Sequence, residues 1–299
     1  MVTVLLAVYV GLMLLHTVNM GRDCIKHKDD LGKGNWIVSG IIGFVTDFLD
    51  TLGIGSFAPT TLLLNMTKQL SSDRLLPGTL NVGHGIPVLV EAFIFTTVVD
   101  VSPVTLFALV GSATVGAFIG SKFVTGLPEK KVQLWMGWAL IITAVLMFAR
   151  QQGWIDVLGA DNTATALTGI KLVIGVVINF ILGALMTIGV GLYAPCMAMV
   201  YMLGLSPLVA FPVMMGSCAG LMPVASLNFV KTGDYARKVS LAITVGGIIG
   251  VIVAAKFVTG LDLNVLTYII IVVIIITGVM YIRCLLYTSP SPRDRSVSR

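Results

Sequence analysis

The chain has 299 residues, of which 57% are hydrophobic and only 11% are charged. Soluble domains carry about 25% charged residues, whereas the mean hydropathy here is +0.99. These values exclude a soluble globular enzyme, a disordered chain and a nucleic-acid-binding protein. The 19 Lys and Arg residues outnumber the 14 Asp and Glu residues. They lie between long apolar stretches, as loop charges do in membrane proteins.

Seven apolar runs are long enough to cross a bilayer, which takes about 20 residues. They cover residues 1–20, 76–99, 103–127, 132–149, 207–230, 238–258 and 263–283. Two further apolar stretches, 36–66 and 168–203, are each broken in the middle by Gly and then Pro. The first run has no basic n-region and no clear cleavage site, so it does not read as a signal peptide.

The last segment, 284–299, changes character abruptly and is polar, basic and rich in Ser and Pro. It resembles a translated adapter, and we interpret it as a non-native tail. The alternative is an ordinary disordered cytoplasmic tail. In either case it contributes nothing to the expected fold.

An internal repeat organises the rest of the chain. TLGIGSFAP at 51–59 returns as TIGVGLYAP at 187–195, and KFVTGL at 122–127 returns unchanged at 256–261. Matches in one order at nearly one offset predict two copies of a unit of about 130 residues. The predicted units are an extra N-terminal helix and cytoplasmic loop over 1–35, repeat one over 36–150 and repeat two over 168–283.

The distribution of basic residues predicts the orientation of the two copies. If both broken stretches are hairpins that leave on their side of entry, thirteen Lys and Arg of residues 1–283 lie inside and three outside. Single crossings would give only ten against six. Since cytoplasmic loops carry the excess, the hairpin arrangement is favoured.

The predicted fold is therefore an all-α integral membrane protein. It has two inverted repeats, each a glycine-broken re-entrant hairpin plus three transmembrane helices, with one extra N-terminal helix. An odd number of crossings per repeat inverts the second copy. Inverted repeats with broken helices are typical of secondary transporters, whose sites lie near the midplane.

The two broken turns are the candidate binding sites. Paired glycines permit positive φ and close backbone approach, and the prolines that follow suit the first turn of a helix. Two half-helix N-termini meeting at mid-membrane would hold an anion without a buried cation. Alternatively, the glycines only permit helix packing. The candidate substrate-binding residues are Thr51, Gly53, Gly55, Ser56, Pro59, Thr187, Gly189, Gly191 and Pro195, with His84 and Ser217.

Four ionisable residues fall at membrane depth: Asp47, Asp50, His84 and Glu91. Such residues are costly in lipid and usually functional. Asp47 and Asp50 share a helix face, show no cationic neighbour, and lack acidic counterparts in repeat two. We predict a coupling site at Asp47, Asp50 and Glu91. A packing role for these acids, and for His84 in place of a cavity-lining or proton-shuttling one, is the alternative.

Three stretches resemble the sulfite exporter TauE/SafE family, also called TSUP permeases. They are the broken hairpin over Gly40–Pro59, its copy over Gly183–Pro195, and the small-residue stretch over Met215–Asp234. The resemblance covers about 36–283. It departs from the family pattern at Gly53–Ser56, where the glycine run is thinner, and at His84, where Ser or Thr is usual.

The resemblance implies a multi-pass permease of the inner (plasma) membrane of a prokaryote. Its substrates would be small organic or sulfur-containing anions such as sulfite, thiosulfate, sulfonates or sulfoacetate. We expect a proton- or ion-coupled secondary transporter that needs no metal or other cofactor and does not bind nucleic acid. The alternatives are an anion channel and an intramembrane enzyme. Paired acids on one short helix do not supply a catalytic set.

Overall fold

The computed structural model describes residues 2–72, 75–123, 129–152, 162–186 and 192–287. Over these residues the chain is helical, and its only β-pairing is an isolated bridge between Ala164 and Leu205. The prediction of an all-α protein is confirmed. The helices are α1 (Val2–Lys26), α2 (Trp36–Thr51), α3 (Phe57–Met66), α4 (Leu76–Val98), α5 (Pro103–Phe123), α6 (Glu129–Gln151), α7 (Gly169–Met186), α8 (Tyr193–Met202), η3 (Pro207–Val209), α9 (Ala210–Thr232), α10 (Arg237–Thr259) and α11 (Leu263–Tyr287).

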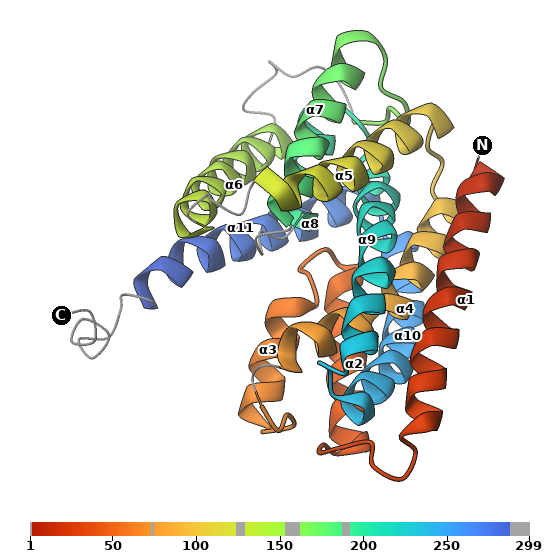
Figure 1. Ribbon diagram of the computed structural model, residues 1–299. Coiled ribbons are helices and arrows are strands. Elements are labelled where there is room, and N and C mark those ends of the chain that lie inside the picture. Colours follow the sequence, from red (N-terminus) through yellow and green to blue (C-terminus); the bar gives the residue numbers. More distant parts are fainter. Residues whose placement is uncertain (1, 73–74, 124–128, 153–161, 187–191, 288–299) are drawn as a thin grey trace.

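Several of these helices have the length and apolar composition of membrane spans (Figure 1). Each of the seven apolar runs of the sequence coincides with one helix: α1, α4, α5, α6, α9, α10 or α11. Within the described residues, the segments long and apolar enough to cross a membrane are Val2–Lys26, Leu76–Val98, Pro207–Thr232 and Arg237–Val258. The chain is therefore a multi-pass membrane protein.

The first broken stretch folds into two helices of unequal length. Helix α2 has 16 residues and α3 has 10, and the turn between them contains Gly53 and Gly55, both with φ of 90°. Side chains strongly disfavour that backbone conformation, so the glycine pair is what allows the chain to turn. The half-helix α3 begins at Phe57, directly after the glycines, as predicted.

The second broken stretch also contains two helices, the 18-residue α7 and the 10-residue α8. Helix α8 begins at Tyr193, shortly after the second glycine pair. The turn itself lies outside the described residues, and with it the predicted site residues Thr187, Gly189 and Gly191.

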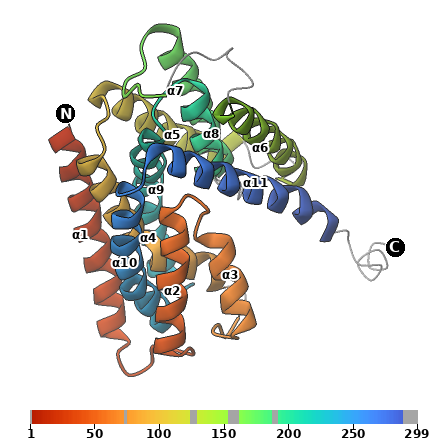
Figure 2. The same ribbon diagram turned by 180° about the vertical axis from the view of Figure 1, so that it is seen from behind.

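Helices of the two halves pack against each other in pairs (Figures 1 and 2). Helix α2 lies along α10, α7 along α5, α4 against α9, and α6 against α11, while α1 covers α4 and α9. Two of the pairs meet almost backbone to backbone. A Cβ atom on Gly246 of α10 would overlap the carbonyl oxygen of Gly40 in α2, and one on Gly183 of α7 would overlap that of Ala113 in α5.

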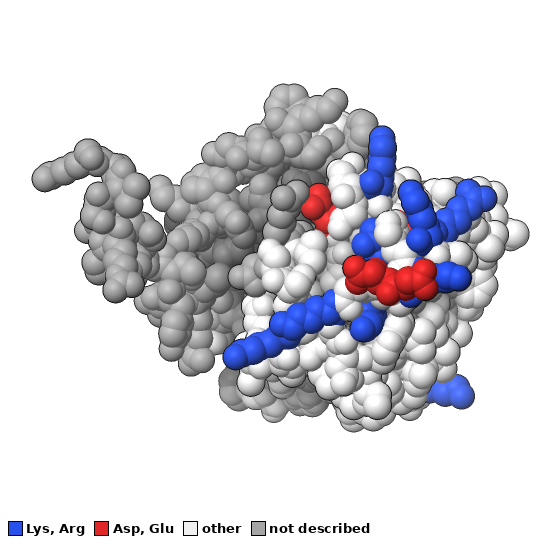
Figure 3. Space-filling model, turned by 60° about the horizontal axis from the view of Figure 1, so that its bottom comes forward, with Lys and Arg blue, Asp and Glu red and all other residues white. Residues whose placement is uncertain are grey.

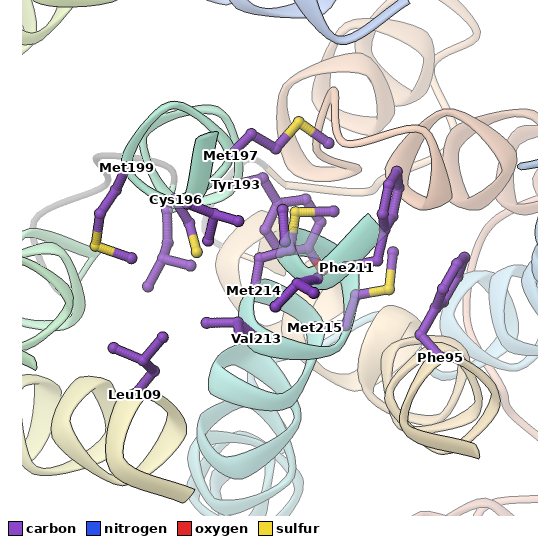
Figure 4. Close-up of a cluster of buried hydrophobic side chains, with 14 of the residues drawn as sticks. Phe95, Leu109, Tyr193, Cys196, Met197, Met199, Phe211, Val213, Met214 and Met215 are labelled. Atoms are coloured by element: carbon purple, nitrogen blue, oxygen red, sulfur yellow. The ribbon is translucent and has the colours of Figure 1, made fainter. Parts of the chain in front are cut away.

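The apolar core surrounds α8 and the first half of α9 (Figure 4). The rings of Phe95 and Phe211 stack with centroids 5.0 Å apart, beside Met214 and Met215, which are fully buried. Thioether chains fill irregular gaps between helices because they are flexible and polarisable. The half-helix of the second repeat is thus set in an apolar environment.

Large apolar side chains also cover the outside of the molecule. Leu14 of α1 is 61% exposed, Ile170 of α7 71% and Val245 of α10 63%. Extended apolar exposure of this kind marks a surface that another apolar phase must cover. A lipid bilayer is the phase that fits a bundle of such helices.

One end of the molecule is rich in basic side chains (Figure 3). It carries the loop after α1 and the turn between α9 and α10. Among the described residues, the segments at this end hold Arg22, Lys26, Lys28, Lys33, Lys68, Lys231, Arg237 and Lys238. Lys256, at the other end of α10, lies far from them along the helix.

Helix α1 is tied to repeat two at this basic end. Nε of Arg237 donates to Asp23 over 2.6 Å, and the Tyr235 hydroxyl donates to the same carboxylate over 2.7 Å. Burial, and then the bond to the Asp23 carboxylate, raise the pKa of the Tyr235 phenol above its ordinary value. The extra N-terminal helix is therefore a docked part of the bundle.

Candidate functional site

The four ionisable residues predicted at membrane depth gather into one buried cluster. Asp47 and Asp50 come from the end of α2, and His84 and Glu91 from the middle of α4. Asp47, His84 and Glu91 are fully buried, and Asp50 is 2% exposed. Charged groups are this deeply buried only when paired or functional.

His84 links three helices. Its Nδ1 atom lies 2.7 Å from Oδ1 of Asp47 in α2, and its Nε2 lies 3.0 Å from the hydroxyl of Thr60 in α3. A carboxylate only accepts, so Nδ1 carries a proton. Nε2 then accepts from Thr60 when the imidazole is neutral and donates to it when charged. Asp47 was expected to have no cationic neighbour, and the structure places beside it an imidazole that can become cationic, from a residue 37 positions away in sequence.

Asp50 sits at the N-terminus of α3. Its Oδ2 accepts from the Ser56 hydroxyl over 3.1 Å, and Ser56 is the residue that directly precedes α3. The Tyr193 hydroxyl of α8 lies 3.5 Å from the same oxygen. Asp50 therefore receives donors from both hairpins.

Glu91 meets the end of α2 through Thr51. The Thr51 hydroxyl lies 2.7 Å from Oε1 of Glu91 and 2.8 Å from the carbonyl oxygen of Asp47. A hydroxyl has a single proton to donate. Thr51 can therefore make both hydrogen bonds only if it donates to the Asp47 carbonyl and accepts from a protonated Glu91.

Two carboxyl oxygens in the cluster have no hydrogen-bond partner. They are Oδ2 of Asp47 and Oε2 of Glu91. Asp47 Oδ2 lies against the Cα of Gly247 in α10, and a Cβ there would overlap it. Leaving a buried polar atom unpaired costs about 1–3 kcal/mol, so these oxygens are available to a proton or a ligand.

The two glycines of the first turn have different surroundings. A Cβ on Gly53 would overlap the methyl group of Met197 in α8, whereas nothing lies within 4 Å of the Cβ position of Gly55. Gly53 is thus the point where the hairpins touch, and Gly55 borders open space. Residues of the two broken stretches are therefore in contact at Gly53 and Met197.

The other predicted residues take less central places. Pro59 and Pro195 are each the third residue of a half-helix, within the first turn as predicted. Ser217 of α9 donates to the carbonyl of Val213 and accepts from Asn179 of α7 over 3.4 Å. Its contacts are thus with repeat-two helices rather than with the acidic cluster.

Sequence reasoning missed three contributors to the cluster: Thr60, Tyr193 and Gly247. Tyr193 had a signal, since it takes the place of Phe57 in the repeat and adds a hydroxyl to an otherwise similar motif. Thr60 and Gly247 had none, because their roles depend on which helix faces them. Among the described residues, no group of His, Cys, Asp and Glu is arranged to hold a metal ion.

The model of one protein family, described as sulfite exporter TauE/SafE, matches residues 89–281. The match covers more than half of the chain. The chain belongs to the sulfite exporter TauE/SafE family. Its members are membrane transporters rather than enzymes, so this protein is a permease that handles a small molecule. The matched residues begin near Glu91 and include nearly all of repeat two, 168–281. No curated protein and no solved structure matches the chain.

Proposed function

We propose that this TauE/SafE protein is a secondary transporter of small oxyanions, with sulfite, thiosulfate, sulfonates and sulfoacetate as the substrate class. The proposal rests on the contact between the two broken hairpins, where Tyr193 of α8 contacts Asp50 and a Cβ on Gly53 would meet Met197. Half-helix N-termini present unpaired N–H groups and a positive dipole end. Such a pair binds an anion without a permanent cation, so that release stays possible.

We further propose that the repeats are inverted, which supports alternating access about the site. The support is an exchange of equivalent contacts. Gly250 of α10 meets the Phe44 carbonyl of α2, and Gly116 of α5 meets the Phe180 carbonyl of α7. At the repeat offset Phe44 corresponds to Phe180 and Gly116 corresponds to Gly250. The second contact is therefore the first one with the two halves of the chain exchanged. A two-fold relation between the halves produces this exchange.

The orientation we propose places the basic end in the cytoplasm. Cytoplasmic loops carry the excess of Lys and Arg, and the loop after α1 together with the α9–α10 turn supplies most of the described basic residues. Helix α2 then enters from the cytoplasm. The protein would lie in the inner membrane of a prokaryote.

Coupling to protons is the role we propose for Asp47, Asp50 and Glu91. Three carboxyl groups share a buried site with one imidazole. Like charges so close together in low dielectric disfavour full ionisation, and His84 can compensate only one of the carboxylates, so the other carboxyls exchange protons most readily. Such a site can gain or lose a proton as the anion moves.

The deciding experiment is uptake into proteoliposomes containing the purified protein. We expect labelled sulfite or thiosulfate to accumulate above its outside concentration when a proton gradient is imposed. Accumulation that collapses with an uncoupler identifies a coupled transporter. Flux that only equilibrates would identify a channel, and the absence of flux for every sulfur oxyanion and sulfonate offered would contradict the proposed function.

A further inference from the structure

The N-terminus of α3 is already occupied by a carboxyl group of the protein itself, that of Asp50. Asp50 Oδ2 lies 3.1 Å from the hydroxyl of Ser56, the residue that directly precedes α3. The Tyr193 hydroxyl lies 3.5 Å away on the second hairpin. These donors are the ones that the proposed function assigns to a substrate oxyanion.

We infer that Asp50 is a resident anion that substrate and proton replace together. The inference rests on the proposed function, which makes the meeting point of the hairpins the substrate site. A carboxylate and a sulfonate or sulfite oxygen take the same N–H and O–H donors. One set of donors therefore cannot serve both, and Asp50 must leave them when the substrate arrives.

Protonation is what releases Asp50. The titratable groups that face it are Asp47 from α2, His84 and Glu91 from α4, Tyr193 from α8 and Cys218 from α9. Only His84 can carry a positive charge, and it is already paired with Asp47. A second anion beside an ionised Asp50 would thus be uncompensated in a low-dielectric site. A proton from solvent on an Asp50 oxygen removes that repulsion and turns an acceptor into a donor.

The substrate class follows from this balance of charge. One proton taken up by Asp50 offsets one negative charge, so a monoanion enters with no net change in buried charge. A dianion would leave one extra negative charge beside the remaining carboxyls. The site should therefore prefer singly charged oxyanions, such as a sulfonate or hydrogen sulfite, to doubly charged ones such as thiosulfate.

The test uses methanesulfonate, whose charge does not change with pH, and the full-length protein in detergent. Binding is measured by calorimetry between about pH 5 and about pH 8. Uptake of one proton per anion predicts that wild-type affinity falls about tenfold per pH unit on the alkaline side. The Asp50→Asn variant should lose this slope. Asp29→Asn, at an exposed loop carboxyl, is the matched control and should keep it.

A second measurement avoids dependence on any variant. Adding methanesulfonate to wild-type protein at the alkaline end of the same pH range, in weakly buffered solution with an indicator dye, should consume about one proton per anion bound. Binding without proton uptake, or a slope that persists in Asp50→Asn, would overturn the inference and leave anion transport intact. No anion binding at any pH would instead overturn the proposed function itself.

Discussion

His84 and Asp47 form a hydrogen bond of 2.7 Å between Nδ1 and Oδ1, and both side chains are completely buried. The pair joins the middle of α4 to the end of α2, beside the turn where the hairpin breaks. Buried ion pairs contribute little net stability, but removing one partner leaves the other uncompensated. Each partner therefore fixes the state of the other.

Removing one member of this pair leaves the other uncompensated, so the losses from removing the two should not add. We expect His84→Ala or Asp47→Ala alone to lower the free energy of unfolding by about 3–5 kcal/mol. The double variant should lose clearly less than the sum of the two. Thermal unfolding of the detergent-solubilised proteins, analysed as a double-mutant cycle, measures the difference. Additive losses would mean that the two groups do not interact.

Gly247 should be needed for the Asp47 carboxylate. A Cβ at this position overlaps Asp47 Oδ2, so Gly247→Ala must displace a buried carboxylate or part α10 from α2, at a cost of about 1–3 kcal/mol. Gly11→Ala in α1 is the control, because nothing lies within 4 Å of its Cβ position. It should be neutral or stabilising by about 0.5–1 kcal/mol. Equal unfolding temperatures for the two variants would contradict the overlap.

The two glycines of the first turn should respond differently to substitution. Both have φ of 90°, so each alanine variant carries backbone strain of about 1–2 kcal/mol. Gly53→Ala also meets Met197 and should lose more stability than Gly55→Ala. In a Met197→Ala background, Gly53→Ala should cost less than it does in the wild type, whereas Gly55→Ala should cost the same. The unfolding temperatures of the wild type, the three single variants and the two double variants measure this.

Larger side chains at the same turn should act on transport. Gly55 borders open space, so Gly55→Val should leave the protein inserted while its side chain blocks backbone approach and abolishes uptake in proteoliposomes. We expect the same of Gly191→Val. Lys256→Gln should matter much less, because Lys256 lies in the last turn of α10. Uptake that survives both valines but fails in Lys256→Gln would move the site to a cation elsewhere.

The two hairpins should open to opposite sides of the membrane. Ser71 follows α3 and Thr168 precedes α7, and both are exposed. With the native cysteines replaced, a cysteine at position 71 should react with a membrane-impermeant maleimide only in inverted vesicles. One at position 168 should react only in intact cells. Labelling of both from one side would contradict the inverted repeat.

Much of the fold could be predicted from the apolar runs of the sequence and from the positions of its Gly and Pro residues. The apolar runs gave the long helices because hydrocarbon tolerates only backbone that is internally hydrogen-bonded. The glycine pair and Ala-Pro at 51–59 predicted that a half-helix starts just after the glycines, as α3 does, since positive φ and a missing N–H are local requirements. Both signals act within a few residues, so a linear sequence carries them.

The candidate site was less accessible, because its decisive contacts are between helices. Asp47 and Asp50 stood out as acids in an apolar stretch, but nothing in the sequence indicates that His84 reaches Asp47 while Ser56 and Tyr193 reach Asp50. Ser56 and Tyr193 lie at similar distances from the Asp50 carboxyl group, although they are 6 and 143 residues away from it in sequence. Which carboxyl faces which donor depends on helix rotation, and that is set by packing.

The exchange of partners between the halves has a consequence for how the protein is made. Helix α2 finds its closest neighbour in α10 and α7 finds its own in α5, so in each half the longer helix of the hairpin rests mainly on a helix of the other half. When α2 leaves the ribosome, α10 has yet to be synthesised. The first hairpin must wait in the membrane with its glycine-lined backbone uncovered. A gene divided between α6 and α7 should yield fragments that are degraded when produced singly and that assemble into a working permease when co-expressed.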